Sequence, residues 1–474
     1  MLDRLKNRKN LLFLCCILGI CLMSLYMGLA DFDYYWQKYL GKSVCSGNFY
    51  GWKDLVWGTK GLGTYYDHEW LSNVLFYFCS CIDGDFIGVV LIKLIVALSW
   101  GIGVYLLIKD FNKDLSKTQK LIILLTVFVI STVVLKAKAY CLSSVFLMIE
   151  FIILHRYKIE GVAFNKKRFI QMLILTVVWN NIHSGSVLLL FVVAGLFWLI
   201  EARNKYVFRT GVVCFISLLL NPYGFNLVVF NLMHNFNSVM KDILLDWRPL
   251  DTKEDLGKAL FIVIALYVVS LFNIVRKHNL FYVLCSAFLL YMTLGSARHI
   301  IYLVPVIIIL LCRGDLRVGF IERIDMGYVL FIIVCLLLLV IMSTFMNNNV
   351  KNSYIMEYKD KELVSILKET NSDSCDGLFS SDVDLSSIGL KAFTTGCFPY
   401  VERRIVDEIV ISYGSESDVK KIIDYYGLTK FLFYSKDTTH TFYDLNKTLY
   451  DYLNNSDKYE KLYESDYYVY FVEK

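Results

Sequence analysis

Two carboxylates that follow the first apolar segment are placed for catalysis. Asp31 and Asp33 come directly after an apolar stretch, where a membrane helix would reach the interface. A carboxylate there can act as general base toward an acceptor hydroxyl, or bind a divalent cation through oxygen. Alternatively, both acids are simply solvated at a helix end. Trp36 and the two tyrosines before it offer a sugar-stacking surface, or form an ordinary aromatic belt.

A second acidic group lies in the sequence Asp67-His68-Glu69-Trp70. It is not the metalloprotease motif H-E-x-x-H, because Ser72 stands where the second histidine is needed. Glu69 and His183 could share a metal ion, although two ligands from distant segments do not define a site. His183 could equally be an interfacial histidine satisfied by hydrogen bonds.

Two cations lie between apolar segments, at Arg298 and Lys138. A cation at a membrane surface suits a lipid phosphate, which arginine binds with two parallel hydrogen bonds. Snorkelling of the side chain is the alternative, and it suits Lys138 better than Arg298. The other polar or aromatic candidates for substrate binding interrupt later apolar segments: Trp179, Asn181, Asn221, Asp246, Trp247 and Arg248.

The composition indicates a polytopic membrane protein. Of the 474 residues 57% are hydrophobic and only 19% are charged, whereas soluble domains carry about a quarter charged residues. The net charge of +5 is small, and the basic residues gather in short loops. This pattern favours contacts with lipid headgroups over nucleic-acid binding.

The distribution of basic loops predicts about 11 membrane helices, with a cytoplasmic N-terminus and the polar clusters on the outer side. A short apolar segment, Leu71–Ile82, is expected to lie along the outer interface, within a first outer loop of about residues 31–85. A second outer loop is expected at about residues 221–256. The expected helices cover about residues 11–30, 86–108, 121–135, 140–154, 169–180, 186–200, 207–220, 257–275, 280–296, 299–312 and 327–346.

The composition changes near residue 347, where the apolar runs shorten. Residues 1–346 are therefore assigned to the membrane domain, and 347–474 to a small extracytoplasmic α/β domain. Its expected helices are Lys361–Thr370 and Asp444–Leu453, and its expected strands are Phe431–Tyr434 and Tyr467–Val472. The sequence leaves open whether Cys375 and Cys397 are bonded.

Six short motifs in order between residues 30 and 300 resemble those of the GT-C superfamily of polytopic glycosyltransferases. The pattern is similar to that of a bacterial branch with D-x-D, H-E-W-L, W-x-N-x-H-x-G and N-P-x-G motifs. Departures occur at Gln37, Ser184 and Asp246, where that branch often has His, Gly and Glu. The matching segments are Asp31–Trp36, His68–Leu71, Trp179–Gly185, Asn221–Gly224, Asp246-Trp247 and Ala297-Arg298, with a looser match at Phe398–Arg404.

The resemblance implies a bacterial cytoplasmic-membrane enzyme that transfers a sugar from a polyprenyl-phosphate donor. The acceptor at the outer face would be an envelope glycan, a lipid or a protein. Asp33 is then the expected base, supported by Asp31, while Glu69 and His183 position the acceptor or complete a divalent-cation site with these acids. His68 and Trp36 would contact substrate.

Arg298, with Lys138 or Arg248, would bind the donor phosphate. The rival hypotheses are a transporter or flippase for lipid-linked glycans and a non-catalytic assembly partner. Transporters commonly show internal repeats and charges near the bilayer midplane, whereas the charges noted above lie at the ends of the predicted helices.

Overall fold

The chain forms two compact units in the computed structural model. The first comprises Met1–Asp31 and His68–Val350, and the second comprises Phe32–Asp67 and Lys351–Lys474. This differs from the predicted division, because residues 32–67 pack with the C-terminal part of the chain. Asp31, Asp246, Trp247, Arg248, Cys397 and the predicted helix at 327–346 lie outside the described residues. The structure describes residues 2–25, 33–112, 114–160, 165–235, 255–272, 280–323, 360–380, 385–394, 398–434, 447–466 and 468–474.

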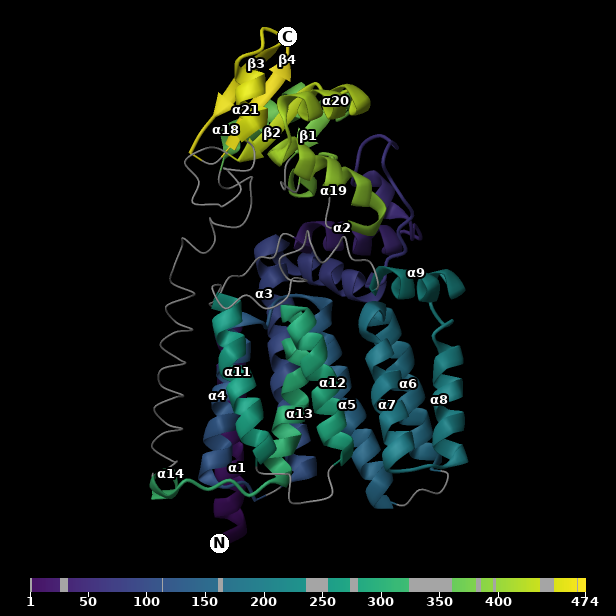
Figure 1. Ribbon diagram of the computed structural model, residues 1–474, viewed down its shortest axis with the longest axis vertical. Helices are drawn as coiled ribbons and strands as arrows, with labels where there is room; N and C mark the ends of the chain where they lie inside the picture. Colours follow the sequence, from purple (N-terminus) through teal and green to yellow (C-terminus); the bar gives the residue numbers. More distant parts are fainter. Residues whose placement is uncertain are drawn as a thin grey trace. The chain divides into compact units, whose positions relative to one another are not determined.

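The first unit is a bundle of helices, and the whole chain is mainly helical with one small mixed sheet, as predicted (Figure 1). Two helical segments of the described residues are long and apolar enough to cross a membrane, Ile87–Phe111 and Ala139–Glu160. The helices of the unit are α1 (Leu2–Leu22), α3 (Trp70–Phe111), α4 (Lys117–Val133), α5 (Ala139–Glu160), α6 (Lys166–Ile182), α7 (Leu188–Ile200), α8 (Lys205–Ser217), α9 (Phe225–Asn235), α11 (Asp255–Phe272), α12 (Leu280–Gly295), α13 (Ile300–Arg313) and α14 (Gly319–Arg323). The described part of this unit also contains the short 3₁₀ turns η1 (Met23–Leu25), η3 (Ser184–Ser186) and η5 (Ala297–His299).

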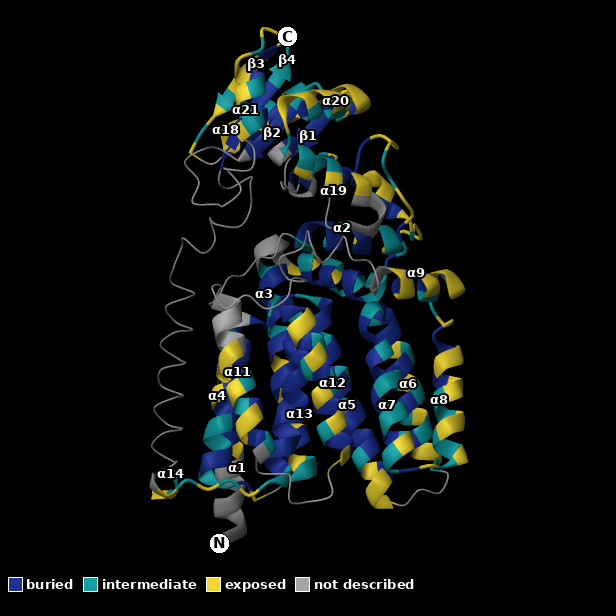
Figure 2. Cartoon of the chain, in the orientation of Figure 1, coloured by how far each residue is buried: buried dark blue, intermediate teal, exposed yellow. Residues whose placement is uncertain are grey.

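Helix α13 forms the centre of this bundle. Its residues from Ile300 to Cys312 are all buried, and it packs against α3, α4, α5, α11 and α12. The surrounding helices keep one face exposed, and much of that face is apolar (Figure 2). Exposed apolar residues recur at helical spacing on α3 (Leu98, Ile102, Leu106), α6 (Ile170, Ile174, Val178) and α8 (Phe208, Val212, Phe215).

Two of the predicted outer loops contain more helix than expected. The segment Leu71–Ile82 is not a separate helix but the first part of α3, which continues to Phe111. No proline interrupts this stretch, so every backbone N–H remains available for the helix. The loop predicted at 221–256 contains α9.

The second unit is built on a four-stranded sheet in the order β1-β2-β4-β3. Strands β1 (Leu378–Ser380) and β2 (Lys430–Tyr434) are parallel, whereas β4 (Tyr468–Glu473) is antiparallel to both β2 and β3 (Tyr459–Glu464). The helices of the unit are α2 (Asp33–Cys45), α18 (Lys361–Thr370), α19 (Phe398–Tyr413), α20 (Glu416–Tyr426) and α21 (Lys447–Asn454), with 3₁₀ turns η2 (Gly51–Asp54) and η6 (Leu385–Ile388). The helix predicted at 361–370 is confirmed. The strands predicted at 431–434 and 467–472 correspond to β2 and β4, and the helix predicted at 444–453 corresponds to α21.

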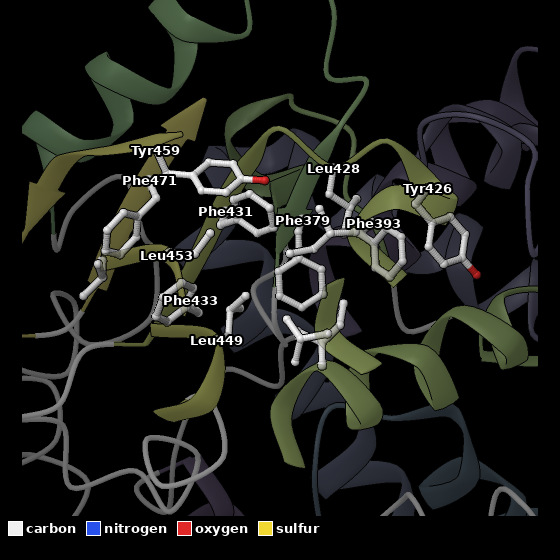
Figure 3. Packing of buried hydrophobic residues seen from close by; sticks show 14 of the residues in the cluster. Phe379, Phe393, Tyr426, Leu428, Phe431, Phe433, Leu449, Leu453, Tyr459 and Phe471 are labelled. Carbon is white, nitrogen blue, oxygen red and sulfur yellow. The ribbon is translucent and has the colours of Figure 1, made fainter. Parts of the chain in front are cut away.

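Aromatic and aliphatic side chains from the sheet and the helices form the core of this unit (Figure 3). Trp57, which lies in the part of this unit before residue 68, belongs to the same core. Its indole N–H donates to the carbonyl oxygen of Leu378 in β1 at 2.6 Å, and the neighbouring Val56 forms a bridge with Ala392. Residues 32–67 are therefore an integral part of the C-terminal fold.

Arg404 of α19 holds the segment around Trp57 and Lys60 against the core of the second unit. None of its surface is exposed, and its guanidinium donates to the carbonyl oxygens of Lys60 (2.8 Å), Trp57 (2.9 Å) and Phe393 (3.1 Å). The guanidinium carbon also lies 5.1 Å from the ring centre of Trp57 and 5.0 Å from that of Phe393. These contacts combine charge-assisted hydrogen bonds with cation–π attraction.

Replacing Arg404 with alanine should loosen this segment. The change leaves the buried carbonyls of Trp57 and Phe393 and the partly buried carbonyl of Lys60 without this donor, and we expect the free energy of unfolding of the unit to fall by about 3 kcal/mol. Arg403→Ala is the matched control, because Arg403 is the neighbouring residue and its own side chain is largely exposed. Hydrogen–deuterium exchange should show residues 51–62 losing protection in Arg404→Ala alone, and equal protection in both variants would contradict the assignment.

Candidate functional site

Three side chains of the first unit, His68, Glu69 and His183, form a cluster with metal-ligand character. The Glu69 Oε1 atom lies 3.3 Å from His183 Nε2 and 3.7 Å from His68 Nε2. One ligand atom from each residue lies within 4.8 Å of the others. The three side chains are mostly buried, so the cluster lies at the edge of the bundle interior rather than on an open surface.

The cluster forms where the beginning of α3 meets the end of α6. His68 and Glu69 directly precede α3, and His183 directly follows α6. The backbone N–H of Ser184 donates to the carbonyl oxygen of His68 at 2.8 Å. This bond joins the two chain segments next to the three side chains.

Two side chains of α3 add hydrogen bonds between the start of α3 and the end of α6. The indole N–H of Trp70 donates to Asn181 Oδ1 at 2.8 Å, and the Ser72 hydroxyl donates to the carbonyl oxygen of Ile182 at 2.9 Å. The last carbonyls of a helix have no intrahelical partner, so the Ser72 bond satisfies a group that α6 leaves open.

The ring of His183 is held by two serines. Its Nδ1 lies 2.9 Å from Ser143 Oγ of α5 and 2.6 Å from Ser186 Oγ of η3. Trp179 Nε1 donates to both hydroxyl oxygens, at 3.1 and 3.0 Å. Because Nδ1 is occupied by hydroxyl groups, Nε2 is the nitrogen that faces Glu69.

The protonation of His183 suits ligand chemistry. Burial, followed by the positive charges of His68, Arg298 and His299, holds the pKa of His183 well below its usual range. The neutral imidazole can donate from Nδ1 to a serine oxygen and present its Nε2 lone pair to an ion. A histidine must be neutral to bind a metal, and this environment keeps the ring neutral.

The donor set fits a divalent transition metal. Two imidazole nitrogens and one carboxylate oxygen are the protein ligands of many catalytic zinc sites, which keep a further position open. Ligand atoms about 2.1 Å from a tetrahedral ion lie about 3.4 Å apart. The distances of 3.3 and 3.7 Å from Glu69 Oε1 to the two histidine nitrogens are close to that separation. Imidazole ligands favour Zn²⁺ or a similar ion over Mg²⁺ and Ca²⁺.

Gly185 keeps space beside the cluster. A Cβ atom added there would lie 3.6 Å from His68 Cδ2 and 3.9 Å from His183 Nε2. A larger side chain would therefore occupy the volume next to the ligand atoms. This gives a physical reason for the glycine at the end of the segment Trp179–Gly185.

Three residues predicted to bind substrate make hydrogen bonds within the first unit. Trp179 is fully buried against the two serines. The Asn181 amide donates to the carbonyl oxygens of Val177 and Leu220 at 2.7 and 3.0 Å. Asn221 bonds the backbone of its own turn, at Leu218, Tyr223 and Gly224.

Two of the three predicted phosphate-binding cations, Arg298 and Lys138, lie in turns of the first unit, and Arg248 is outside the described residues. Arg298 is half-buried in η5, between α12 and α13, and its charge acts on His183. Lys138 is half-buried in the turn before α5, where its carbonyl oxygen accepts from the Cys141 N–H at 3.1 Å. Arg298 is therefore the cation whose field reaches the cluster.

Asp33 and Trp36 belong to the second unit. Asp33 is the first residue of α2, and the Trp36 indole N–H donates to its Oδ1 at 3.1 Å. The hydrogen bond to Asp33 orients the Trp36 ring. Trp36 is buried, so little of the ring is exposed for stacking on a sugar.

Sequence analysis did not identify His68 as a potential ligand, nor Ser143 and Ser186 as partners of His183. The structure brings together Glu69 and His183, which were both predicted metal ligands, and adds His68 to them. A signal for the serines exists in the sequence: Ser143 and Ser144 stand among apolar residues, where a hydroxyl needs a partner.

Of the two cysteines considered from the sequence, Cys375 is described, and its Sγ lies 3.4 Å from the backbone nitrogen of Lys391.

Comparison with known proteins finds no family model and no curated protein that matches the sequence.

Removing both serine hydroxyls should weaken metal binding without removing a ligand. In the double variant Ser143→Ala/Ser186→Ala the ring of His183 loses both Nδ1 partners, and we expect zinc affinity to fall by about 10–100-fold. Chelator competition in detergent measures this change. Ser144→Ala is the matched control, because Ser144 is also buried but bonds only the carbonyl oxygen of Cys141 among the contacts described. An equal loss in the control, or no loss in the double variant, would contradict the assignment.

Proposed function

We propose that the chain is a membrane-embedded glycosyltransferase that takes a sugar from a polyprenyl-phosphate donor. The observation that carries the proposal is the His68–Glu69–His183 cluster with the cationic field of Arg298 acting on it. Together these residues supply ligands for a divalent cation and a positive charge suited to phosphate. The order of the six sequence motifs adds the reaction class.

The exposed apolar faces of the first unit support its place in a membrane. A soluble helix normally turns a polar face outward, whereas α3, α6 and α8 expose apolar side chains at helical spacing. We infer a bundle of about 11 membrane helices in a bacterial cytoplasmic membrane, with the N-terminus cytoplasmic and the second unit extracytoplasmic.

Each residue in the reaction has a defined task. The bond between the anomeric carbon and the donor phosphate breaks, the acceptor hydroxyl oxygen bonds to that carbon, and a base takes the hydroxyl proton. Arg298 binds the phosphate and stabilises its charge as the sugar leaves. A divalent ion held by His68, Glu69 and His183 would supply further positive charge for phosphate oxygens.

Asp33 is the proposed base. The N–H of Trp36 donates to its carboxylate and orients the group at the start of α2. The acceptor, an envelope glycan, lipid or protein, and the sugar are not specified by these residues.

The donor-binding part of the proposal is tested with Arg298→Lys, assayed on the purified protein in lipid with polyprenyl-phosphate sugars and envelope acceptors. Lysine keeps the charge but loses the planar fork, so we expect the donor KM to rise while the acceptor KM changes little. Arg317→Lys is the control, because Arg317 is exposed and pairs with Asp315. Absence of transfer by the unaltered protein with any lipid-linked sugar would refute the proposed function.

The role of the base is tested separately with Asp33→Asn. The amide oxygen can still accept from Trp36, so the local structure should persist while basicity is lost. We expect kcat to fall by about 10²–10⁴-fold. Asp54→Asn, at an exposed position of the same unit, should retain activity. Near-normal turnover of Asp33→Asn would remove Asp33 from the mechanism.

A transporter of lipid-linked glycans is the second candidate, and one observation favours it. Glu150 lies midway along α5, fully buried, whereas the charges considered from the sequence lie at helix ends. Carboxylates deep within a membrane bundle are common in transporters. Movement of the lipid-linked substrate across vesicles without sugar transfer would favour this alternative.

A further inference from the structure

Glu150 is a buried carboxyl group that the proposed transfer reaction does not use. It lies in the middle of α5, and none of its surface is exposed. Neither of its carboxyl oxygens has a hydrogen-bond partner among the described residues. The next buried side chains along the same helix, Met148 and Phe151, are apolar and fully enclosed.

The helices packed against α5 bring no described cation to this carboxyl group. Helix α6 has no ionisable residue from Phe169 to Ile182, and α7 has none at all. On α13 the ionisable groups are Tyr302, Cys312 and the terminal Arg313. The thiols of Cys214 in α8 and Cys285 in α12 lie within electrostatic range of Glu150.

Among the basic groups of α3 and α5, Lys109 is exposed, Lys158 pairs with Glu201, and the others contact groups other than Glu150. Lys93 of α3 donates to the carbonyl oxygen of Ser24 at 2.7 Å. Arg156 of α5 pairs with Asp110 at 2.7 Å, and His155 stacks on Phe111 with ring centres 4.1 Å apart. The remaining ionisable groups of α3 are Tyr77, Cys79, Cys81, Asp83, Asp85, Tyr105 and Lys109.

An ionised carboxylate is far more costly to bury than a neutral acid when no cation or hydrogen-bond donor compensates it. The cost is highest inside a helix bundle whose outer faces are apolar. The neutral acid avoids most of this cost, because only a polar group and not a full charge is withdrawn from water.

We propose that Glu150 is a proton-binding site, with its carboxyl group held as a neutral acid inside the helical unit. The ligand is a proton, and the site is separate from the His68–Glu69–His183 cluster. The inference does not depend on the glycosyltransferase proposal, because it rests on the burial and surroundings of one side chain.

Infrared difference spectroscopy tests the protonation directly. The spectrum of the unaltered protein in lipid minus that of Glu150→Gln should contain the carbonyl stretch of a protonated carboxyl group, which shifts in D₂O. Glu201→Gln is the matched control, because Glu201 pairs with Lys158 and should contribute only carboxylate bands. Glu150→Asp should retain a protonated-acid band. A carboxylate band lost in Glu150→Gln would overturn the proposal.

Thermal unfolding gives a second, independent measurement. Glutamine has nearly the shape of the neutral acid, and leucine removes the unsatisfied polar group, so we expect both variants to melt no lower than the unaltered protein. A large fall in melting temperature for Glu150→Leu and Glu150→Gln together would mean that an ionised Glu150 has a partner, and would overturn the proposal.

Discussion

Helix ends inside an apolar bundle leave backbone carbonyls without partners, and the candidate site is organised around satisfying them. The end of α6 receives the hydroxyl of Ser72, while Asn180 and Asn181 in its last turn donate to the carbonyl oxygens of Leu218 and Leu220 beyond α8. These bonds fix where α3 begins relative to where α6 ends. The two histidines and Glu69 lie at that joint, so their mutual distances follow from backbone requirements.

The charge of the cluster determines what it can bind. Glu69 is the only acidic member of the three, so the cluster supplies at most one negative charge. A divalent ion would leave the site with a net positive charge, and Arg298 adds to it. Such a field favours an anionic ligand, and a phosphate group has the geometry that arginine recognises. The low pKa of His183 belongs to the same arrangement, because nearby positive charge and burial keep its nitrogen available for an ion.

The helices and the outline of the site could be predicted from the sequence, but the partners could not. The predicted segments at 121–135 and 140–154 correspond to α4 and α5, because apolar runs and basic loops define such helices locally. The pairing of Glu69 with His183 was anticipated, whereas Ser143 depends on α5 packing beside α6, which no local pattern encodes. The same holds for residues 32–67: Arg404 binds Trp57 across more than three hundred positions, and only the folded unit reveals that contact.

Two carboxylates of the first unit illustrate how surroundings set chemistry. Glu69 lies beside two imidazole nitrogens, so its carboxylate can serve together with them as a ligand of an ion. Glu150 is enclosed by apolar side chains, with no described group that would stabilise a charge. The same functional group therefore suits an ion in one place and a proton in the other. Because α5 carries both Glu150 and Ser143, a change in the packing of this helix would act on the proton site and on the orientation of His183 together.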